Sequence, residues 1–268
     1  MDITPQIREL LRKIRSQRTL VHHITNYVTV NDCANVVLAI GANPVMADDA
    51  QEVEEMVSIC NALVINIGTL NERTLDSMLK AGKKANELSI PIVLDPVGVG
   101  ATSFRFGAIE RLLESIHFSV IRGNLAEIKA LCGLDVKRAG VDSLEEEENA
   151  QWIAQNLAQK LGCTIGITGK TDTISDGTSL YTLDNGTAHL SRLTGTGCMS
   201  SSLIGSFLGA SKNPLLSTIA GIGVMGIGGE IASCSFEGAG SFRVKLMDAI
   251  SLMSDEVFLE KIKWSKVL

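Results

Sequence analysis

Short apolar runs that alternate with longer amphipathic segments are the feature that most limits how this chain can fold. Residues 63–66 and 92–95, for example, are apolar until a final Asn66 or Asp95. A strand buried on both faces reads as a continuous apolar run, and segments of helical length between such strands supply the covering layers. The repeated strand–helix–strand order therefore predicts an α/β fold with a mostly parallel central sheet flanked by helices.

Composition and spacing favour one large domain of this class. Hydrophobic residues make up 45% and aromatic residues 4% of the chain, which favours an aliphatic core over an aromatic-rich sandwich or barrel. No Pro/Ser-rich linker divides the sequence, so we expect a single domain over residues 1–268. Strands are expected at 20–23, 43–46, 63–66, 92–95, 119–121 and 164–167, a hairpin at 172–189, helices at 5–16, 30–40, 71–88, 104–116, 125–132 and 146–161, and three further helices to finish the chain.

Charge, cysteine spacing and hydropathy exclude several classes of function. The formal net charge is −6 and no basic run occurs, which predicts no nucleic-acid partner. The six cysteines lack the C-x-x-C spacing of zinc sites. The apolar stretch 214–231 is rich in small and hydroxyl residues and ends near Glu230, so we expect a buried helix and no membrane span. The chain opens on an amphipathic segment instead of a leader, which predicts a cytoplasmic protein with reduced thiols.

Polar residues follow most of the predicted strands at the point where each strand ends. Because the carboxyl ends of parallel strands meet at one edge of a sheet, we expect these polar residues to converge there. The segments expected at this edge are 22–26, 46–49, 66–69, 95–98, 122–124 and 168–170. Open α/β sheets bind their ligands at this edge, which makes it the expected ligand site.

A glycine-rich turn before the last helices predicts an anion site. Gly195, Thr196 and Gly197 lead directly into an apolar segment rich in small residues that begins with Cys198. Backbone N–H groups at the start of a helix point outward together and favour a phosphate. The same position stabilises a thiolate, so the cysteine calls for a chemical explanation.

Cys198 has three interpretations on sequence alone. It could be an inert buried thiol, as most cytosolic cysteines are. It could be a nucleophile, which requires a nearby base, and His22, His23, His117 and His189 are the candidates. It could instead lie beside a substrate hydroxyl during phosphoryl transfer, where alignment and charge stabilisation dominate.

Five polar residues at or just after strand ends also have alternative interpretations. Asp95 could hold Mg²⁺ or stabilise its own turn. Asn124 and Glu127 have the spacing of a helix capping box, and Glu127 could also face a metal. Arg122 suits a nucleotide phosphate, and Thr168 could bind a phosphate or ribose or belong to an ordinary turn.

Two nucleotide-binding motifs are excluded. The G-x-G-x-x-G match at residues 221–226 lies between apolar helical segments, where glycines that allow close helix packing explain it better than a dinucleotide site. No G-x-x-x-x-G-K-[ST] loop occurs, so a P-loop enzyme is not expected.

Five motifs together resemble one known family. LDPVGVG at 94–100, RGNLAEI at 122–128 and GTGC at 195–198 are similar to motifs of the ribokinase-like superfamily. HITNYVTVND at 23–32 and AIGANPVMA at 39–47 resemble the hydroxyethylthiazole kinase family of thiamine salvage. The resemblance covers essentially the whole chain and implies a ribokinase-like three-layer αβα fold.

The resemblance also implies an activity and a set of site residues. The family transfers the ATP γ-phosphate to the hydroxyl of 4-methyl-5-(2-hydroxyethyl)thiazole, requires Mg²⁺ and forms homotrimers with sites between subunits. Cys198 then lies beside the reacting hydroxyl, at a position where most superfamily members have an aspartate. The implied roles are thiazole binding for Met46, Gly195, Asn26 and Gly68, ATP binding for Arg122 and Thr168, an anion hole at Gly195, Thr196 and Gly197, and metal binding for Asp95 and Glu127.

Three other functions remain open on sequence alone. A related kinase of the same fold could act on a pyrimidine or pyridoxal alcohol, and the pocket around Asn26 and Met46 would decide between them. A hydrolase or acyl transferase could use Cys198 as its nucleophile. A nucleotide sensor would bind ATP without turnover, although the combination of metal, anion-hole and base candidates argues against it.

Overall fold

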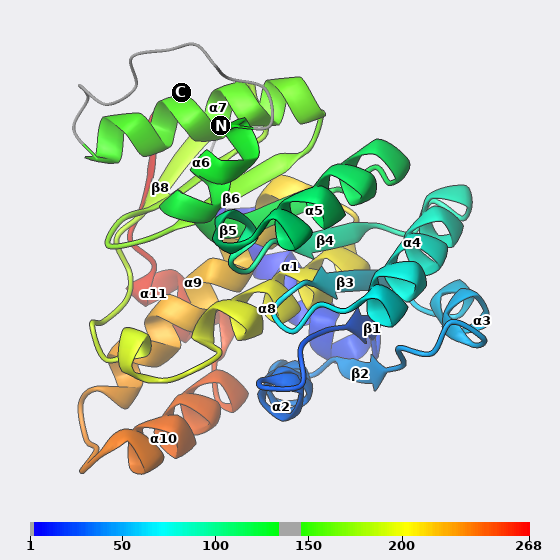
Figure 1. Ribbon diagram of the computed structural model, residues 1–268. Coiled ribbons are helices and arrows are strands. Elements are labelled where there is room, and N and C mark those ends of the chain that lie inside the picture. Colours follow the sequence, from blue (N-terminus) through cyan, green and yellow to red (C-terminus); the bar gives the residue numbers. More distant parts are fainter. Residues whose placement is uncertain (1–2, 134–145) are drawn as a thin grey trace.

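A nine-stranded sheet runs through the computed structural model, which describes residues 3–133 and 146–268 (Figure 1). The strand order is β2-β1-β3-β4-β5-β6-β7-β8-β9. Neighbouring strands from β2 to β6 are parallel, and those from β6 to β9 are antiparallel. The strands are β1 (Leu20–Ile24), β2 (Asn43–Met46), β3 (Ala62–Asn66), β4 (Ile92–Asp95), β5 (Val120–Asn124), β6 (Thr164–Thr168), β7 (Asp172–Ser175), β8 (Leu180–Leu183) and β9 (Trp264–Lys266).

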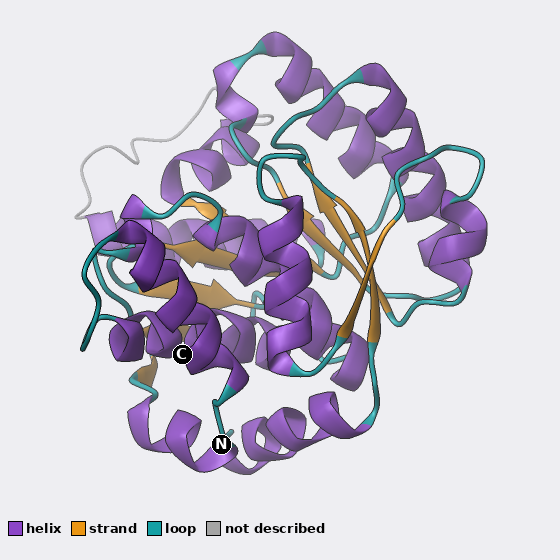
Figure 2. Ribbon diagram, turned by 90° about the horizontal axis from the view of Figure 1, so that it is seen from below, coloured by secondary structure: helices purple, strands orange, loops and turns teal. Residues whose placement is uncertain are grey.

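Helices cover both faces of the sheet and confirm the predicted three-layer α/β architecture (Figure 2). Their bounds are α1 (Thr4–Ser16), α2 (Val30–Ile40), α3 (Val53–Ser58), α4 (Glu72–Glu87), α5 (Ser103–Ser115), α6 (Leu125–Gly133), α7 (Glu146–Leu161), α8 (Thr196–Ser211), α9 (Pro214–Ala232), α10 (Ala239–Ser251) and α11 (Asp255–Lys261), with short 3₁₀ turns at Val99–Ala101 and Leu190–Arg192. Most of the predicted elements agree with these bounds to within a residue or two.

Side-chain alternation along the strands divides the core into two layers. In β3, Val64 packs in one buried cluster with α8, whereas Leu63 and Ile65 pack in the other cluster with α4 and α5. Successive strand residues point to opposite faces, so a run that is apolar throughout is buried on both sides. This is the physical basis of the continuous apolar runs in the sequence.

The C-terminal region differs from the prediction of three final helices. Four helices, α8 to α11, follow the hairpin, and the short strand β9 then pairs antiparallel with β8, with Leu183 opposite Trp264. The six-residue helix α3 was also not predicted. Elements this short carry too few residues for a recognisable period. The predicted hairpin is confirmed as β7 and β8, and it extends the main sheet.

Helix α9 is a buried core helix that is long and apolar enough to cross a membrane by length and composition alone. Its mean hydropathy is 1.6, and 78% of the apolar window is buried inside the fold, where it packs against α8 and α10. A Cβ added at Gly221 would lie 2.7 Å from the backbone nitrogen of Ile204 in α8. The glycines of the G-x-G-x-x-G match therefore allow close helix packing, as predicted.

Candidate active site

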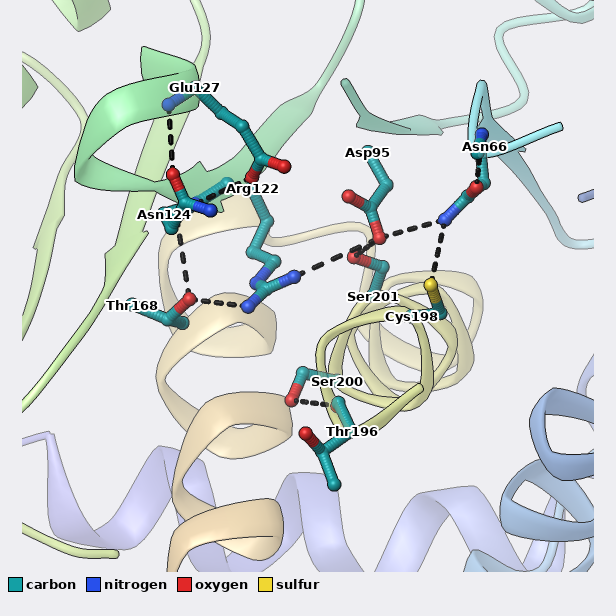
Figure 3. A network of polar contacts seen from close by, with 12 residues as sticks. Asn66, Asp95, Arg122, Asn124, Glu127, Thr168, Thr196, Cys198, Ser200 and Ser201 are labelled. Atoms are coloured by element: carbon teal, nitrogen blue, oxygen red, sulfur yellow. Dashed lines mark hydrogen bonds and ion pairs between the residues drawn. The ribbon is translucent and has the colours of Figure 1, made fainter. Parts of the chain in front are cut away.

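The ends of β3 and β4 and the first turn of α8 bring three polar side chains into one chain of contacts (Figure 3). The strands are in register so that Asn66 lies beside Asp95. Asn66 Nδ2 donates to Asp95 Oδ2 at 2.9 Å and to Cys198 Sγ at 3.2 Å. Ser201, one turn after Cys198, donates its hydroxyl to the same Asp95 oxygen at 2.9 Å. The thiol and the buried carboxyl are thus linked through one amide.

Asn26, in the loop after β1, completes the surroundings of the thiol. Its Nδ2 donates to Cys198 Sγ at 3.4 Å and to Asn66 Oδ1 at 3.0 Å. Its Oδ1 accepts hydrogen bonds from the backbone N–H and the hydroxyl of Thr29, at 3.0 and 3.1 Å. Gly68 packs against this amide, since a Cβ added there would lie 2.9 Å from Asn26 Cβ. Asn26 and Gly68 therefore meet near Cys198, which agrees with the expected convergence of their segments at this edge, and their role in binding stays a prediction.

The start of α8 has the geometry of an anion site. Gly195 is the residue before the helix, with φ of 89°, in the left-handed region that glycine favours. No side chain caps this helix start in the described part of the chain, so its first N–H groups are available to a ligand. A Cβ added at Gly197 would lie 2.6 Å from Arg122 Nη1, so the guanidinium lies directly against the turn.

Arg122 is in β5, and its side chain lies between the C-terminal ends of the neighbouring strands β4 and β6. One nitrogen, Nη2, donates a short hydrogen bond to the hydroxyl of Thr168 at the end of β6, and Nη1 lies 3.8 Å from Asp95 Oδ2. The residue is 8% exposed, and its Nε has no hydrogen-bond partner. A guanidinium held by one hydroxyl and one carboxylate keeps donor capacity for a phosphate.

Glu127 performs the capping role that its spacing predicted. Its Oε2 accepts from the N–H of Asn124 at 2.9 Å, while Asn124 Oδ1 accepts from the N–H of Glu127. Its Oε1 accepts from the N–H of Gly98 at 2.9 Å and so joins the β4 and β5 loops. The negative charge of Glu127 also acts on Asp95, which places the two carboxyl groups in one electrostatic site.

Burial keeps both the thiol and the central carboxyl closer to their neutral forms. Desolvation raises the pKa of Asp95 to about 6, opposed first by Arg122 and then by the hydroxyl of Ser201. Desolvation, and then the charge of Asp95, raise the pKa of Cys198 above its ordinary value. Cys198 is therefore a thiol at neutral pH and not a thiolate.

A cavity of about 500 Å³ lies beside the start of α8. Arg122 and Thr168 line one part of it, and Leu190 and Met225 line another. A smaller hollow of about 220 Å³ lies at the ends of β1 and β2 and is lined by Met46. The larger cavity combines an anion-compatible end with apolar lining residues, and the smaller hollow presents Met46 among mostly polar side chains.

The sequence did not indicate several residues of this network. Asn66 was expected at the sheet edge but without a role, although it joins Asp95, Asn26 and Cys198. Ser201 lies in the segment rich in small residues that begins with Cys198, and Thr29 lies just before the helix expected at 30–40, but neither was given a role. Their only sequence signal is position, at a strand end or one turn beyond the glycine-rich motif. Met46 lines the smaller hollow, whose lining residues do not include Cys198.

Comparison with known proteins identifies first the fold of this chain and then its family. A ribokinase-like superfamily protein from Enterococcus faecalis superposes with a TM-score of 0.63 at 14% identity, over 91% of this chain and 89% of that one. A hydroxyethylthiazole kinase protein from Pyrococcus horikoshii superposes with a TM-score of 0.91 at 40% identity, over 98% of this chain and 100% of that one. A hydroxyethylthiazole kinase from Alkaliphilus oremlandii is 54% identical over 94% of each chain.

The αβα layers and these superpositions define the ribokinase-like fold, and the relatives at 40% and 54% identity are kinases. The profile of the hydroxyethylthiazole kinase family matches residues 11–256. The chain belongs to the hydroxyethylthiazole kinase family. The resemblance in the sequence motifs is confirmed, and so is the prediction that the protein is a phosphoryl-transferring enzyme.

Proposed function

We propose that the protein transfers the γ-phosphate of ATP to the hydroxyl of 4-methyl-5-(2-hydroxyethyl)thiazole. The observation that carries the proposal is the position of Cys198, in the first turn of the anion-compatible helix and against the amides of Asn26 and Asn66. A hydroxyl beside this thiol would lie next to the N–H groups of the helix start. That is the juxtaposition of acceptor and phosphate that phosphoryl transfer requires.

The 500 Å³ cavity is the proposed ATP site. Arg122 and Thr168 would bind the phosphates at the end nearest α8, and Gly195, Thr196 and Gly197 would supply the anion hole. The N–H groups and the guanidinium stand where negative charge develops during transfer, and a preorganised set of donors costs no rearrangement at that moment. The close approach of Gly197 to Arg122 supports this joint role.

The thiazole is proposed to bind between Asn26, Gly68 and Gly195 on one side and Met46, in the neighbouring hollow, on the other. Met46 offers an apolar, polarisable surface for the sulfur-containing ring. Tyr27 and Val28, in the loop that leads from Asn26, are 78% and 59% exposed. Two large side chains left open beside the substrate site support a homotrimer in which a neighbouring subunit covers them.

Cys198 is proposed to orient the substrate hydroxyl and not to attack it. Its two amide donors hold the sulfur in place, and its raised pKa leaves it protonated at neutral pH. The hydrolase alternative requires a base at the thiol. None of the four histidines, all in the described part of the chain, forms a hydrogen bond with Cys198, and His22 and His23 instead form hydrogen bonds with backbone carbonyls.

Mg²⁺ is the proposed cofactor, with Asp95 and Glu127 as its protein ligands. The buried Oδ1 of Asp95 has no hydrogen-bond partner, so this oxygen is free for a cation. Within residues 3–133 and 146–268 no group of three or more His, Cys, Asp or Glu side chains could hold a metal alone. Mg²⁺ commonly uses one or two carboxylates together with substrate phosphates, so this donor set fits. When bound, the ion would offset charge on the ATP phosphates.

The proposed function also includes a domain organisation, a cellular location and a pathway. Residues 1–268 form one kinase domain that works in the cytoplasm, in thiamine salvage. The continuous sheet from β2 to β9 supports one domain, and the burial of α9 supports a protein without a membrane span.

Turnover with defined alcohols tests the proposed function. Purified protein with Mg²⁺ and ATP is expected to phosphorylate the thiazole alcohol much faster than pyridoxal or a hydroxymethyl pyrimidine. Coupled detection of ADP and mass analysis of the product measure it. ADP formation with pyridoxal or the pyrimidine, and none with the thiazole, would show that the substrate assignment is wrong.

The pH dependence of a Cys198→Ser variant tests the protonation state of the thiol. Because the Cys198 pKa is raised, the fraction of thiolate stays small through neutral pH and increases only above the ordinary thiol value of about 8.5. We therefore expect kcat/KM profiles of wild type and variant to have the same shape between about pH 6 and 8. An activity limb in that range that is present only in the wild type would instead identify a catalytic thiolate.

A further inference from the structure

Asp172 is a carboxyl group on the floor of the 500 Å³ cavity. It begins β7, is 7% exposed, and is the only acidic residue among the described residues that line the cavity. Two residues further along the strand, Ile174 packs in the core cluster that α9 covers. Residues two apart in a strand share a face, so the Asp172 side chain lies on the α9 side of the sheet.

Few hydrogen bonds offset the cost of burying the Asp172 carboxyl group. Oδ1 accepts one hydrogen bond, from the N–H of Gly169 at 3.0 Å, and Oδ2 has no partner among the described residues. Burial raises the pKa of Asp172 to about 7, against the opposing effects of the Gly169 N–H and the Arg122 charge. A buried carboxylate accepts several hydrogen bonds when it is satisfied, so Asp172 has acceptor capacity left for a ligand.

The residues that line the cavity indicate where each part of a nucleotide would bind. Arg122, Thr168 and the start of α8 mark the anionic end, whereas Ile222 and Met225 of α9 form an apolar wall suited to a base. Asp172 is bonded to Gly169, directly after Thr168, and lies on the face that α9 covers. It is therefore joined to the phosphate end by this hydrogen bond and faces the same side of the sheet as the apolar wall, a position that suits the sugar of a nucleotide.

We propose that the Asp172 carboxylate accepts hydrogen bonds from the ribose hydroxyls of the phosphate donor, so that the enzyme selects ribonucleotides over deoxyribonucleotides. The inference rests on the proposed function. A carboxylate beside phosphates is repelled by them and is stabilised by a cation or by hydrogen-bond donors, and the vicinal hydroxyls of ribose are such donors. Acidic side chains read ribose hydroxyls in this way in dinucleotide sites.

Binding of ATP, 2′-deoxy-ATP and 3′-deoxy-ATP to wild type and Asp172→Asn tests the proposal by calorimetry with Mg²⁺ present. Wild type is expected to bind ATP roughly tenfold more tightly than at least one deoxy analogue, the effect of one hydrogen bond to a charged acceptor. In Asp172→Asn, whose Oδ1 still accepts from Gly169, we expect this ratio to fall close to one. The KM for the alcohol should not change.

Asp184→Asn is the matched control, because Asp184 is a nearby acid that bonds to Thr171 and does not line the cavity. It should keep the wild-type preference. Asp172→Ser, checked for folding by thermal unfolding, gives a second loss of the acceptor. Equal affinities of wild type for all three nucleotides, or an equal weakening of all three in Asp172→Asn, would overturn the assignment. Intact ribose selectivity without turnover of the thiazole would instead overturn the proposed function alone.

Discussion

Arg122→Met is expected to lower kcat/KM for ATP by at least roughly 100-fold, the scale of losing one preorganised charge at a transferring phosphoryl group. The guanidinium is buried, lies against Gly197 at the anion site and holds Thr168. No other arginine lines the cavity among the described residues, and Lys170 there is exposed. Steady-state kinetics with ATP varied, at saturating thiazole alcohol, measure the loss.

Arg122→Lys separates charge from geometry. Lysine keeps the positive charge but cannot donate as a planar fork, so it should recover only part of the activity. Removing the charge in Arg122→Met should also raise the Asp95 pKa further above about 6, because Arg122 is the main group that lowers this pKa. Arg111→Met, at an exposed residue of α5, should retain wild-type kinetics. Equal activity of Arg122→Met and Arg111→Met would remove Arg122 from the proposed site.

Gly195→Ala is expected to lower kcat/KM by about 100-fold through displacement of the anion site, since shifts on the order of 1 Å in a catalytic site have effects of this size. The φ of 89° disfavours any side chain, and the new Cβ would lie 2.6 Å from Thr29 Cγ2. Thr29 also holds Asn26, so the strain reaches the amide that contacts Cys198. Gly107→Ala, where a Cβ meets nothing within 4 Å, is the control.

The double variant Gly195→Ala with Thr29→Ser identifies the source of the loss. Serine removes the Cγ2 methyl group that clashes and keeps the hydroxyl that donates to Asn26 Oδ1. Partial recovery of kcat/KM relative to Gly195→Ala is expected, because the contact is relieved while the backbone strain stays. If Gly195→Ala retained wild-type kinetics, the proposed anion hole would be wrong.

The sequence predicted those parts of the molecule that depend on local periodicity and on topology. Apolar runs buried on both faces identified the parallel strands. The rule that parallel strands end at one edge of a sheet then predicted that Asp95, Arg122 and Thr168 lie at the same edge, before any contact between them was known. The glycine-rich turn identified the start of α8 because positive φ and an uncapped helix start are local properties. The roles given to these residues stay predictions until they are tested.

Contacts between distant segments could not be predicted in the same way. The link from Asn66 to both Asp95 and Cys198 depends on strand register and on how α8 packs over β3. Asp172 is buried on the face of β7 where Ile174 packs in the core cluster with α9, which lies far along the chain. Strand β9 has no period long enough to recognise, and its pairing with β8 is settled only by the completed sheet. Long-range packing decided each of these features.

The bonds between Asn185 and the C-terminal segment also bear on the order of events during protein synthesis. Asn185 lines the cavity, donates to the carbonyl of Lys261 at 2.9 Å and accepts from the N–H of Lys263 at 2.7 Å. A nascent chain becomes available from its N-terminus onward, so most of the sheet exists before Lys263 leaves the ribosome. The cavity wall at Asn185 is secured only after that. If the cavity binds ATP as proposed, the nucleotide stabilises only a chain in which the segment around Lys263 is already in place, and a chain that still lacks this segment would gain little from it.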